Sequence, residues 1–455
     1  MTRTDASLAG EEIQAPVSMG KAARTSLWLL FLCYTANQLC AAIISFLAIP
    51  IKLELDISDL QFGVLTGPAF SVTYGVFAFL FAYFADRGNR VNLLVGVLVL
   101  WSIATIACGL AASFIQLLVA RIVVAVGEAG GTPTTLALVS DSVPKARMST
   151  AFSILMLSAP IGFLISAFAG SFFAGEFGWR LTFVICGALG FPIALMMKLK
   201  VRDPRKDTAD GTVVTPPSFN PAQILAGIFA SLKKIVARRS VVLILLGFSW
   251  AHYMGQVLPN WMPIFMNRYH GYSAEDAALY FGIAFVGGIV PGLLCGGFLA
   301  DRLARISPVW RLYVPVLAIC FSVPMFIVAF NVASGALALA IFGFGTFISQ
   351  LGMGPTLGAF NAALPSRIRA TGSATLVLAA SLIAGGLGNI TVGGLSDFLT
   401  SRFDTGSLRI VLSFVVPCFA TVAVSCLLLA RRNFVADLDS ADSADDVADD
   451  GLARA

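Results

Sequence analysis

What this sequence has least of is charge. Only 12% of its 455 residues are Asp, Glu, Lys or Arg, and only two are His. Because soluble globular domains carry about a quarter charged residues, this composition excludes an ordinary soluble domain. Hydrophobic residues make up 58% of the chain and recur in runs of the roughly 20 residues that a helix needs to cross a bilayer. The sequence therefore predicts an all-α integral membrane protein with many transmembrane helices.

Motifs of enzymes and metalloproteins are also missing. The eight Cys are scattered through apolar segments without paired spacing, which is typical of small packing residues and not of a metal or redox site. The chain has no nucleophile–base pair and no nucleotide-binding loop. We therefore expect no enzyme activity, no cofactor, no bound metal and no step driven by ATP bound to this chain.

The two ends of the chain differ from its middle. Residues 1–25 are polar and lack the apolar core of a signal peptide. Residues 437–450 hold seven Asp and no basic residue. Such a segment cannot bury a core, so we expect the acidic C-terminal tail to be solvated and disordered.

The apolar runs fall into two sets of six, separated by a longer polar connection. The predicted spans lie near 26–49, 61–83, 91–112, 114–139, 150–173, 181–199, 241–265, 275–298, 309–331, 335–363, 371–395 and 408–430. The chain then divides into an N-terminal tail, a six-helix bundle, a central loop, a second six-helix bundle and a C-terminal tail, at residues 1–25, 26–199, 200–240, 241–430 and 431–455.

Lys and Arg in the loops predict the orientation. If the N-terminus lies inside, most of the 30 basic residues fall on the cytoplasmic side, nine of them between Lys198 and Arg239. We therefore expect both termini and the central loop to be cytoplasmic, with a bacterial inner membrane as the location. The net charge of +5 follows from this bias and gives no reason to expect nucleic acid as a partner.

Two loop motifs recur in both halves. FADRGNR (84–90) follows the second span, and LADRLAR (299–305) follows the eighth. SVPKAR (142–147) follows the fourth span, and ALPSRIR (363–369) follows the tenth. Because the two pairs recur in the same order at nearly the same offset, we predict two pseudo-symmetric six-helix bundles around a central site.

This layout resembles the major facilitator superfamily over roughly residues 26–430. The N-terminal half is similar to its spinster-like branch. The segments that carry this likeness are ISDLQFGVLTGPAF (57–70), FADRGNR (84–90), ARIVVAVGEAGGTP (120–133), DSVPKARMSTAFS (141–153) and GWR (178–180). The resemblance implies a carrier that works by alternating access, and animal spinster members export lysolipids and sphingoid phosphates.

The first span departs from the family pattern. Members of the family usually carry an Asp-Arg pair a few residues after an Asn in this span. The stretch CYTANQLCAAI keeps Asn37, but the Asp position holds Cys40 and the Arg position holds Ala41. A carboxylate that couples transport to protons in the family is therefore missing here.

The fourth span contains an arginine and a glutamate at membrane depth. Arg121 and Glu128 lie seven positions apart, so on a helix they share a face and are separated by roughly 10 Å along its axis. A charge inside the membrane is costly and by default indicates function. We expect Arg121, which cannot deprotonate, to bind an anionic group and Glu128 to carry the coupling proton. The alternative is a buried polar network that fixes this span against its neighbours.

The seventh span, with WAHYMGQVLPNW, supplies further polar side chains. His252 is a candidate second titrating group, because its unperturbed pKa lies near 6.5. The alternative role for His252 is a structural hydrogen bond. Candidate substrate contacts besides Arg121 are polar or aromatic residues at span depth: Asn37, Tyr74, Thr132, Tyr253, Gln256, Asn260, Trp261, Gln350, Asn361 and Asn389.

The repeated loops predict a gate. The resemblance implies that their acids and arginines form contacts that break when the cytoplasmic side opens, and the alternative is topology charge alone. The predicted latch residues are Asp86, Arg87, Arg90, Arg147, Asp301, Arg302 and Arg369.

Several functions remain open at this point. The first is a proton-coupled secondary carrier, working as a single chain, for a lipid-like or other amphipathic anion, with protons and membrane lipids as its other partners. Another is a proton-coupled importer of small aromatic or sugar acids. A third is a drug efflux antiporter. The last is an uncoupled uniporter or a sensor, favoured by Cys40 at the carboxylate position.

Overall fold

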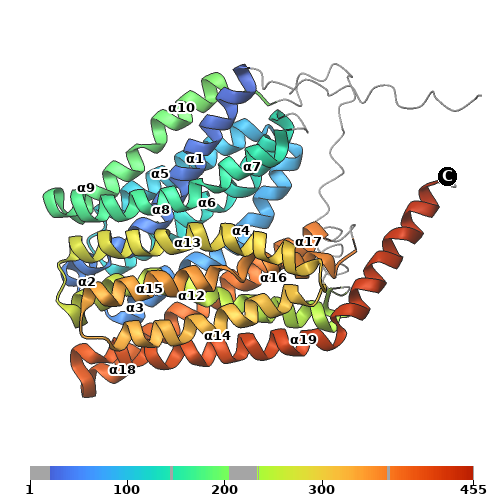
Figure 1. Cartoon of the computed structure of the whole chain (residues 1–455). Helices are drawn as coiled ribbons and strands as arrows, with labels where there is room; N and C mark the ends of the chain where they lie inside the picture. The colour runs from blue at the N-terminus through green and yellow to red at the C-terminus, as the bar shows by residue number, and fades with distance from the viewer. Residues whose placement is uncertain (1–20, 144–146, 204–232, 234, 366–368, 454–455) are drawn as a thin grey trace, which may run out of the picture.

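The computed structural model describes residues 21–143, 147–203, 233, 235–365 and 369–453. The predicted N-terminal tail and central loop fall mostly outside these ranges. In Figure 1, α1 and α5–α10 gather in the upper part and the helices from α12 onward gather in the lower part, while α2, α3 and α4 lie between or among them. The long axes of most helices run in roughly the same direction, as expected for a transmembrane bundle.

The first half of the chain forms six crossings from ten α-helices. Several crossings are broken into two pieces. The elements are α1 (Lys21–Phe46), α2 (Ala48–Leu55), α3 (Asp59–Thr66), α4 (Pro68–Arg87), α5 (Arg90–Leu110), α6 (Phe114–Ser142), α7 (Met148–Met156), α8 (Ser158–Phe168), the π-turn η2 (Ala169–Phe173), α9 (Ala174–Ala188) and α10 (Gly190–Lys200).

The second half repeats this plan. Its elements are α12 (Arg239–His270), α13 (Ala274–Ala304), α14 (Trp310–Asn331), α15 (Gly335–Gln350), α16 (Met353–Ala362), α17 (Arg369–Ala380), the π-turn η5 (Ser381–Leu387), α18 (Gly388–Phe403), the 3₁₀ turn η6 (Asp404–Gly406) and α19 (Ser407–Ala453). The π-turns η2 and η5 interrupt the fifth and the eleventh crossings, which are the same position in the two halves.

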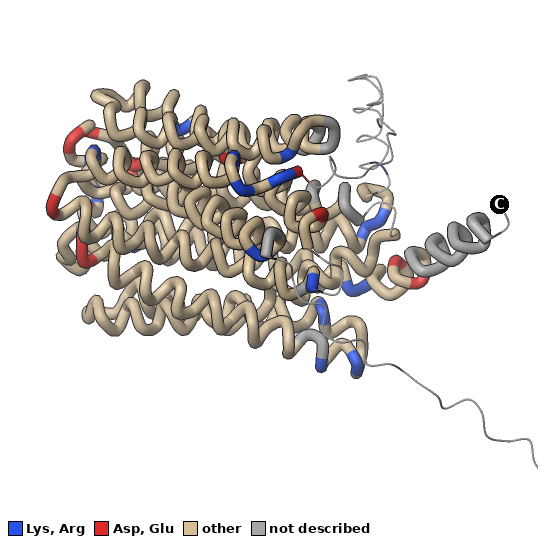
Figure 2. Tube along the Cα trace, turned by 90° about the horizontal axis from the view of Figure 1, so that it is seen from above, with Lys and Arg blue, Asp and Glu red and all other residues tan. Residues whose placement is uncertain are grey.

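The crossings agree with the predicted fold class. Nine segments in the described part of the chain are long and apolar enough to span a membrane. Two of them, Thr150–Lys200 and Thr375–Ser440, run over 51 and 66 residues and contain two crossings each, and α3 with α4 adds one more. The charged residues gather at the two ends of the bundle, with Lys and Arg concentrated at the end from which α19 projects (Figure 2). The protein is an all-α membrane protein with twelve crossings.

Short polar caps set where several helices begin. The side chains of Ser58, Asn89, Ser113, Ser273 and Ser334 each accept a hydrogen bond from a backbone N–H in the first turn of the helix that follows. Such caps satisfy N–H groups that have no partner inside the helix and fix the start of the crossing. The loops between crossings can therefore be short, which keeps neighbouring crossings antiparallel.

The C-terminal segment differs from the disorder expected for 431–455. There α19 continues as a helix to Ala453, and Phe434 is fully buried. The Asp437 carboxylate accepts hydrogen bonds from the backbone N–H and the hydroxyl of Ser240 at 3.2 and 2.5 Å. Arg238 donates to the Asp437 carbonyl at 2.8 Å. Composition predicted disorder from the run of Asp, whereas one of these acids caps the N-terminus of α12.

Candidate functional site

A central cavity of about 610 Å³ lies between the two halves. Its wall combines residues of α1, α3, α4, α6, α7 and α8 from the first half with residues of α12, α13 and α15 from the second. This volume lies within the range of roughly 300–1,000 Å³ that is usual for small-molecule sites. One part of the wall is polar. The other part is apolar and consists mainly of Met156, Ala159, Pro160, Phe163, Phe285, Val286, Ile289 and Leu293.

Arg121 lines this cavity from α6. Its side chain is 2% exposed, and its guanidinium lies 5.0 Å from the centre of the Phe70 ring. Its two terminal nitrogens reach the backbone carbonyls of Cys40 and Ala41 at 3.4 and 3.5 Å, which are long for hydrogen bonds. Its Nε has no partner, and no carboxylate of the described residues lies within 4.0 Å of it. The guanidinium therefore has donors left for an anion.

Glu128 lies on the same helix but behind the cavity wall. It is 1% exposed, and its Oε1 atom has no hydrogen-bond partner. Gly127 and Gly131 bring α6 close to Trp101 of α5, because a Cβ atom on either glycine would meet the indole residue within 3.3 Å. Glu128 is therefore enclosed within the first half, and only Arg121 of the two charged residues reaches the cavity.

A pair of hydroxyl groups lies one helical turn beyond Glu128. The Tyr74 hydroxyl donates to Thr132 Oγ1 at 3.1 Å and links α4 to α6. Asn37 of α1 is buried, and its Nδ2 has no partner. The structure places these three predicted substrate contacts inside the first half and not on the cavity wall, which favours a role near Glu128.

A polar stripe on α12 forms the opposite wall. His252, Gln256 and Asn260 repeat every four residues and all line the cavity. The side-chain nitrogens of His252 and Gln256 lie 3.1 Å apart, and Asn260 Nδ2 donates to the Gln256 carbonyl at 3.0 Å. Gln350 of α15 joins this wall. The hydroxyl of Ser45 on α1 donates to Asn260 Oδ1 at 2.5 Å, so the two halves meet at this point.

The remaining predicted contacts are packing residues of the second half. The Oδ1 atom of Asn389 accepts from Trp261 Nε1 at 3.0 Å and from Asn260 Nδ2 at 3.1 Å. Tyr253 is fully buried. Asn361 Oδ1 accepts from the Ser373 hydroxyl at 2.8 Å. None of Asn389, Trp261, Tyr253 and Asn361 lines the central cavity.

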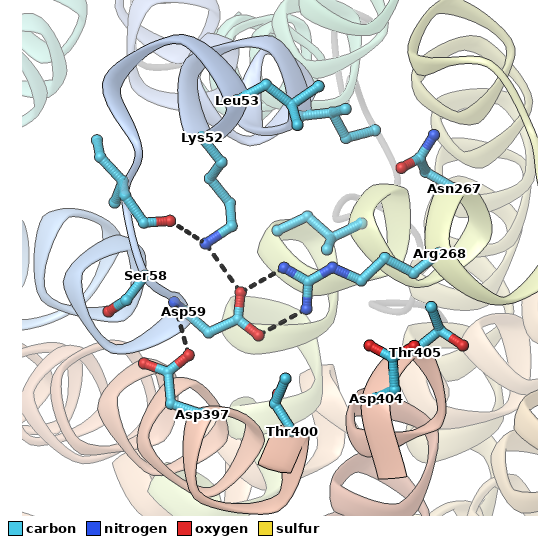
Figure 3. Close-up of a pocket in the computed structure, with 13 residues that line it drawn as sticks. Lys52, Leu53, Ser58, Asp59, Asn267, Arg268, Asp397, Thr400, Asp404 and Thr405 are labelled. Carbon is cyan, nitrogen blue, oxygen red and sulfur yellow. Dashed lines mark hydrogen bonds and ion pairs between the residues drawn. The ribbon is translucent and has the colours of Figure 1, made fainter.

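One end of the bundle is closed by a network around Asp59 (Figure 3). The Asp59 carboxylate accepts a hydrogen bond from each terminal nitrogen of Arg268, both at 2.6 Å, and forms an ion pair with the Lys52 ammonium at 2.8 Å. The Ser396 hydroxyl donates to it at 2.7 Å. Asp397 in turn accepts from the backbone N–H of Asp59 and of the next residue, at 3.0 and 2.8 Å. Lys52 and Asp59 belong to the first half and the other three to the second, so the network joins the halves.

The charges of this network lie beyond the predicted spans. Burial on its own raises the pKa of the Asp59 carboxyl, but the hydrogen bonds and positive charges of Arg268 and Lys52 outweigh burial and hold that pKa well below its usual range. Burial lowers the pKa of Lys52, against the opposing effect of Asp59. Asp59 is therefore ionised throughout the physiological pH range.

Glycines allow the backbones to meet at the same end. A Cβ atom on Gly393 of α18 would lie 2.3 Å from the Asp59 carbonyl oxygen, and one on Gly63 of α3 would lie 2.5 Å from the Asn389 carbonyl oxygen. Both distances are shorter than any tolerated contact. The close approach of α3 and α18 therefore requires glycine at these positions, and the cavity is sealed at the Asp59 end.

The GWR motif braces this end from within the first half. Gly178 has a φ of 78°, which bends the chain before Trp179. Trp179 Nε1 donates to Glu54 Oε2 at 2.5 Å, and Arg180 Nε donates to Glu54 Oε1 at 2.9 Å. These hydrogen bonds lower the pKa of Glu54. They fasten α2 to α9, and α2 carries Lys52.

The predicted latch residues lie at the opposite end. Arg90 pairs with Asp141, its Nε donates to the Ala85 carbonyl at 3.0 Å, and its backbone N–H donates to Asp203 at 2.9 Å. These partners lie in the first half or directly after its last helix α10, so the contacts named here do not join Arg90 to the second half. Arg302 is exposed, and Arg147 precedes α7. The predicted latch side chains of Asp86, Arg87, Asp301 and Arg369 lie outside the described part of the structure.

Sequence reasoning missed the Asp59 network. In the sequence, Asp59 is part of the ISDLQ stretch, and Asp397 and Arg268 are charged residues just outside predicted spans. No pattern relates the three residues to one another. Nothing in the sequence indicates which charge of one half contacts which charge of the other, because the repeated motifs relate equivalent positions and not contacting ones. The one signal in the sequence is that an acidic residue, Asp59, and a basic residue, Arg268, each lie next to a predicted span, and that these spans belong to the same predicted bundle of two halves.

The fold and the cavity define a membrane carrier with two halves, and comparison with known proteins agrees. The sequence profile of the Major Facilitator Superfamily matches residues 30–389, so the chain belongs to this superfamily. It is 30% identical to an MFS-type efflux pump of Mycolicibacterium smegmatis over 404 residues, which are 89% of this chain and 91% of the relative. It is 26% identical to a hexuronate transporter of Bacillus subtilis over 60% of this chain and 63% of that protein.

A solved structure supports the spinster resemblance. The crystal structure of a bacterial homolog of the human lysosomal transporter Spinster, in an inward-facing and unoccupied conformation, has a TM-score of 0.80 and 27% identity. The match covers 92% of this chain and 99% of that one. The predicted membership of the superfamily, the spinster-like resemblance and the fold class are thereby confirmed. The protein is a multi-pass membrane transporter.

Proposed function

We propose that the protein is a secondary transporter that moves an amphipathic or other organic anion by alternating access. Arg121 binds the anionic group, and Glu128 carries the coupling proton, with His252 as a second titrating group. The observation that carries the proposal is that Arg121 is buried, lines the cavity and has no carboxylate partner within 4.0 Å among the described residues. A buried cation without a counter-ion is costly, and an anionic substrate removes that cost.

The apolar part of the cavity supports a lipid-like substrate. Phe163, Phe285, Ile289 and Leu293 lie together on this wall, which could contact an alkyl chain while Arg121 binds the head group. The apolar wall and the single cationic side chain, Arg121, together suit a molecule with one charged end and one apolar end. Lysolipids are the first class to test, since the spinster-like branch that the sequence resembles includes animal exporters of lysolipids.

The closed end and the charge distribution support an orientation. The end from which α19 projects carries most of the basic residues, which is typical of a cytoplasmic face (Figure 2). The closed Asp59 end then faces outward, and the conformation is inward-facing, with both termini cytoplasmic in a bacterial inner membrane. One chain contains both halves of the pathway, so we propose that the monomer is the working unit.

Ligand-induced thermal stabilisation tests the substrate class. A ligand that binds only the folded protein raises its melting temperature by mass action. We expect lysolipids to stabilise the wild type and to lose this effect in Arg121→Gln. The matched control is Arg305→Gln, an exposed arginine away from the cavity. Stabilisation by sugar or aromatic acids alone would instead support an importer of small acids, a reading favoured by the hexuronate relative.

Coupling needs a separate test, because Cys40 stands where the family carries a carboxylate. In proteoliposomes a proton gradient should accelerate uptake by the wild type, and Glu128→Gln should lose this acceleration while retaining substrate exchange. If the gradient has no effect on the wild type but drives uptake by Cys40→Asp, the protein is a uniporter. Drug efflux by proton exchange predicts resistance to toxic compounds on expression, which the same Glu128 variant should abolish.

A further inference from the structure

The charges of the cavity wall are unusually one-sided. Among the described residues that line the central cavity, Arg121 is the charged side chain and no Asp or Glu is present. Glu128 does not line the cavity and is 1% exposed. A substrate in this cavity therefore meets one fixed positive charge and no negative one.

A position in contact with the arginine, where the family pattern has a carboxylate, holds a thiol. Cys40 is 2% exposed, and its Sγ atom lies 4.0 Å from the Cys186 carbonyl oxygen, inside the first half. The contact of Cys40 with Arg121 is made by its backbone carbonyl. An ammonium group bound beside the arginine would thus find no counter-ion.

Among the described residues that line this cavity there is no Trp or Tyr, and the phenyl rings are those of Phe70, Phe163 and Phe285. Cations bind to the faces of Trp, Tyr or Phe rings, but the guanidinium of Arg121 lies over the Phe70 ring. The Phe163 and Phe285 rings pack against each other, with centres 4.9 Å apart. Burying an unpaired cation is strongly unfavourable, so the cavity discriminates against substrates that carry an ammonium group.

Neutral hydrogen-bonding groups complete the polar wall. Gln38 of α1, Gln256 of α12 and Gln350 of α15 present side-chain amides from three helices. The Gln256 amide contacts His252, and no hydrogen bond within the described part of the chain involves the other two amides. Each amide offers two donors and one acceptor oxygen, which are the groups that bind hydroxyls.

We propose that the substrate carries a single anionic group next to hydroxyl groups and no ammonium group, as in an amphiphile with a glycerol-type or sugar-type head. This inference rests on the proposed function and names the substrate class of the same site. It separates glycerol-headed lysolipids from those with choline or ethanolamine heads and from sphingoid phosphates, all of which carry a positive nitrogen.

Three lysolipids with one acyl chain test the inference. Lysophosphatidylglycerol has the phosphate and hydroxyls, whereas lysophosphatidylcholine and lysophosphatidylethanolamine have the same phosphate and a cationic nitrogen. Binding to the purified full chain is measured by thermal stabilisation and by competition. We expect the glycerol lipid to bind at least about tenfold more tightly than the other two, which corresponds to about 1.4 kcal/mol.

Two variants examine the physical cause. Gln256→Glu places a carboxylate on the wall with almost no change of shape, and it should reverse the preference toward the ethanolamine lipid. Gln350→Leu removes an amide and should weaken the glycerol lipid alone. Cys40→Ser is the neutral control and should leave the ratio of affinities unchanged.

The outcomes separate this inference from the proposed function. Equal binding of all three lipids that still depends on Arg121 overturns the inference and leaves the transporter of amphipathic anions standing. If no lysolipid binds, the proposal of a lipid-like substrate is wrong. The preference for an anion without an ammonium group is then tested by comparing binding of gluconate with binding of serine, which is a zwitterion. Tighter binding of gluconate supports this preference, and equal binding of serine refutes it.

Discussion

Asp59 closes one end of the bundle, and replacing it with Asn should open that end. Asn keeps the shape and one acceptor oxygen but removes the negative charge. Arg268 then loses its counter-ion across the interface, and Lys52 loses it within the first half. Because Lys52 and Asp59 both belong to the first half, their contact can persist when the halves separate. Of the contacts that the Asp59 carboxylate makes, those with Arg268 and Ser396 cross between the halves and are the ones that the substitution weakens in the closed state.

The size of the effect follows from those contacts. Asp59 is 3% exposed at its side chain and Arg268 28%, so the pair is partly shielded from water. Removing one partner of a hydrogen-bonded, partly buried charge pair costs roughly 2–5 kcal/mol. Because the Arg268 side chain is partly exposed to water, we take about 3 kcal/mol, in the lower part of this range, as the cost of the substitution to the closed state. Since each 1.4 kcal/mol is about tenfold, the population of the open state should rise by roughly a hundredfold.

Distances between spin labels across the closed end measure this population. Suitable label sites are Leu53, which is 80% exposed on α2, and Phe403, which is 50% exposed on α18. The labels are attached to cysteines in a chain whose eight native cysteines have been replaced. Asp59→Asn should add a long-distance component that is absent or minor in the parent.

Glu54→Gln is the matched control. Glu54 forms the same kind of pair at the same end, but its partners Trp179 and Arg180 lie within the first half. It should leave the distance distribution unchanged. If Asp59→Asn opens the end no more than Glu54→Gln does, the ionic network is not what holds the halves together.

Three further predictions concern the same end of the molecule. Gly393→Ala should also open this end, because the new Cβ atom would collide with the Asp59 carbonyl oxygen. Gly394→Ala is the control and should not open it, because its Cβ atom would meet only a side-chain atom, at 3.6 Å. The same spin-label distances measure both variants. Trp179→Phe should lower the free energy of unfolding by about 1 kcal/mol through one lost hydrogen bond, measured by thermal or denaturant unfolding. Closure of this end should be independent of pH between about 5 and 8. The pKa of Asp59 is lower in the folded protein than in the unfolded chain, where it is about 4. The stabilisation that ionised Asp59 provides is therefore complete above the unfolded pKa and is lost only as the pH falls toward the folded pKa. A midpoint of opening near neutral pH would assign the closure to another group.

The sequence was sufficient to predict the architecture and the arginine that lines the cavity. Apolar runs of membrane length predict crossings because a bilayer leaves the chain few alternatives. Arg121 was found because a cation at that depth is rare and expensive. Both inferences use local information only.

Contacts between the halves were beyond the reach of sequence reasoning. Asn389 and Gln350 are both amides at span depth, yet one packs against Trp261 and the other lines the cavity. The difference depends on how helices are rotated in the bundle, and the period of a helix does not fix that rotation when most of its faces are apolar. The same limit hid the pairing of Asp59 with Arg268.

Three of the buried charged groups, Asp59, Arg121 and Glu128, differ in how completely they are partnered, and this ordering agrees with the roles proposed for them. Asp59 receives two cations and a hydroxyl, so its charge is compensated and it holds the structure. Arg121 has two long hydrogen bonds to carbonyls and a ring, so part of its donor set is left for a ligand. Glu128 has an oxygen without any partner, so its charged form is the least supported of the three. Of the three, its charge is therefore the most costly in this structure, which is why we propose Glu128 as the carrier of the coupling proton.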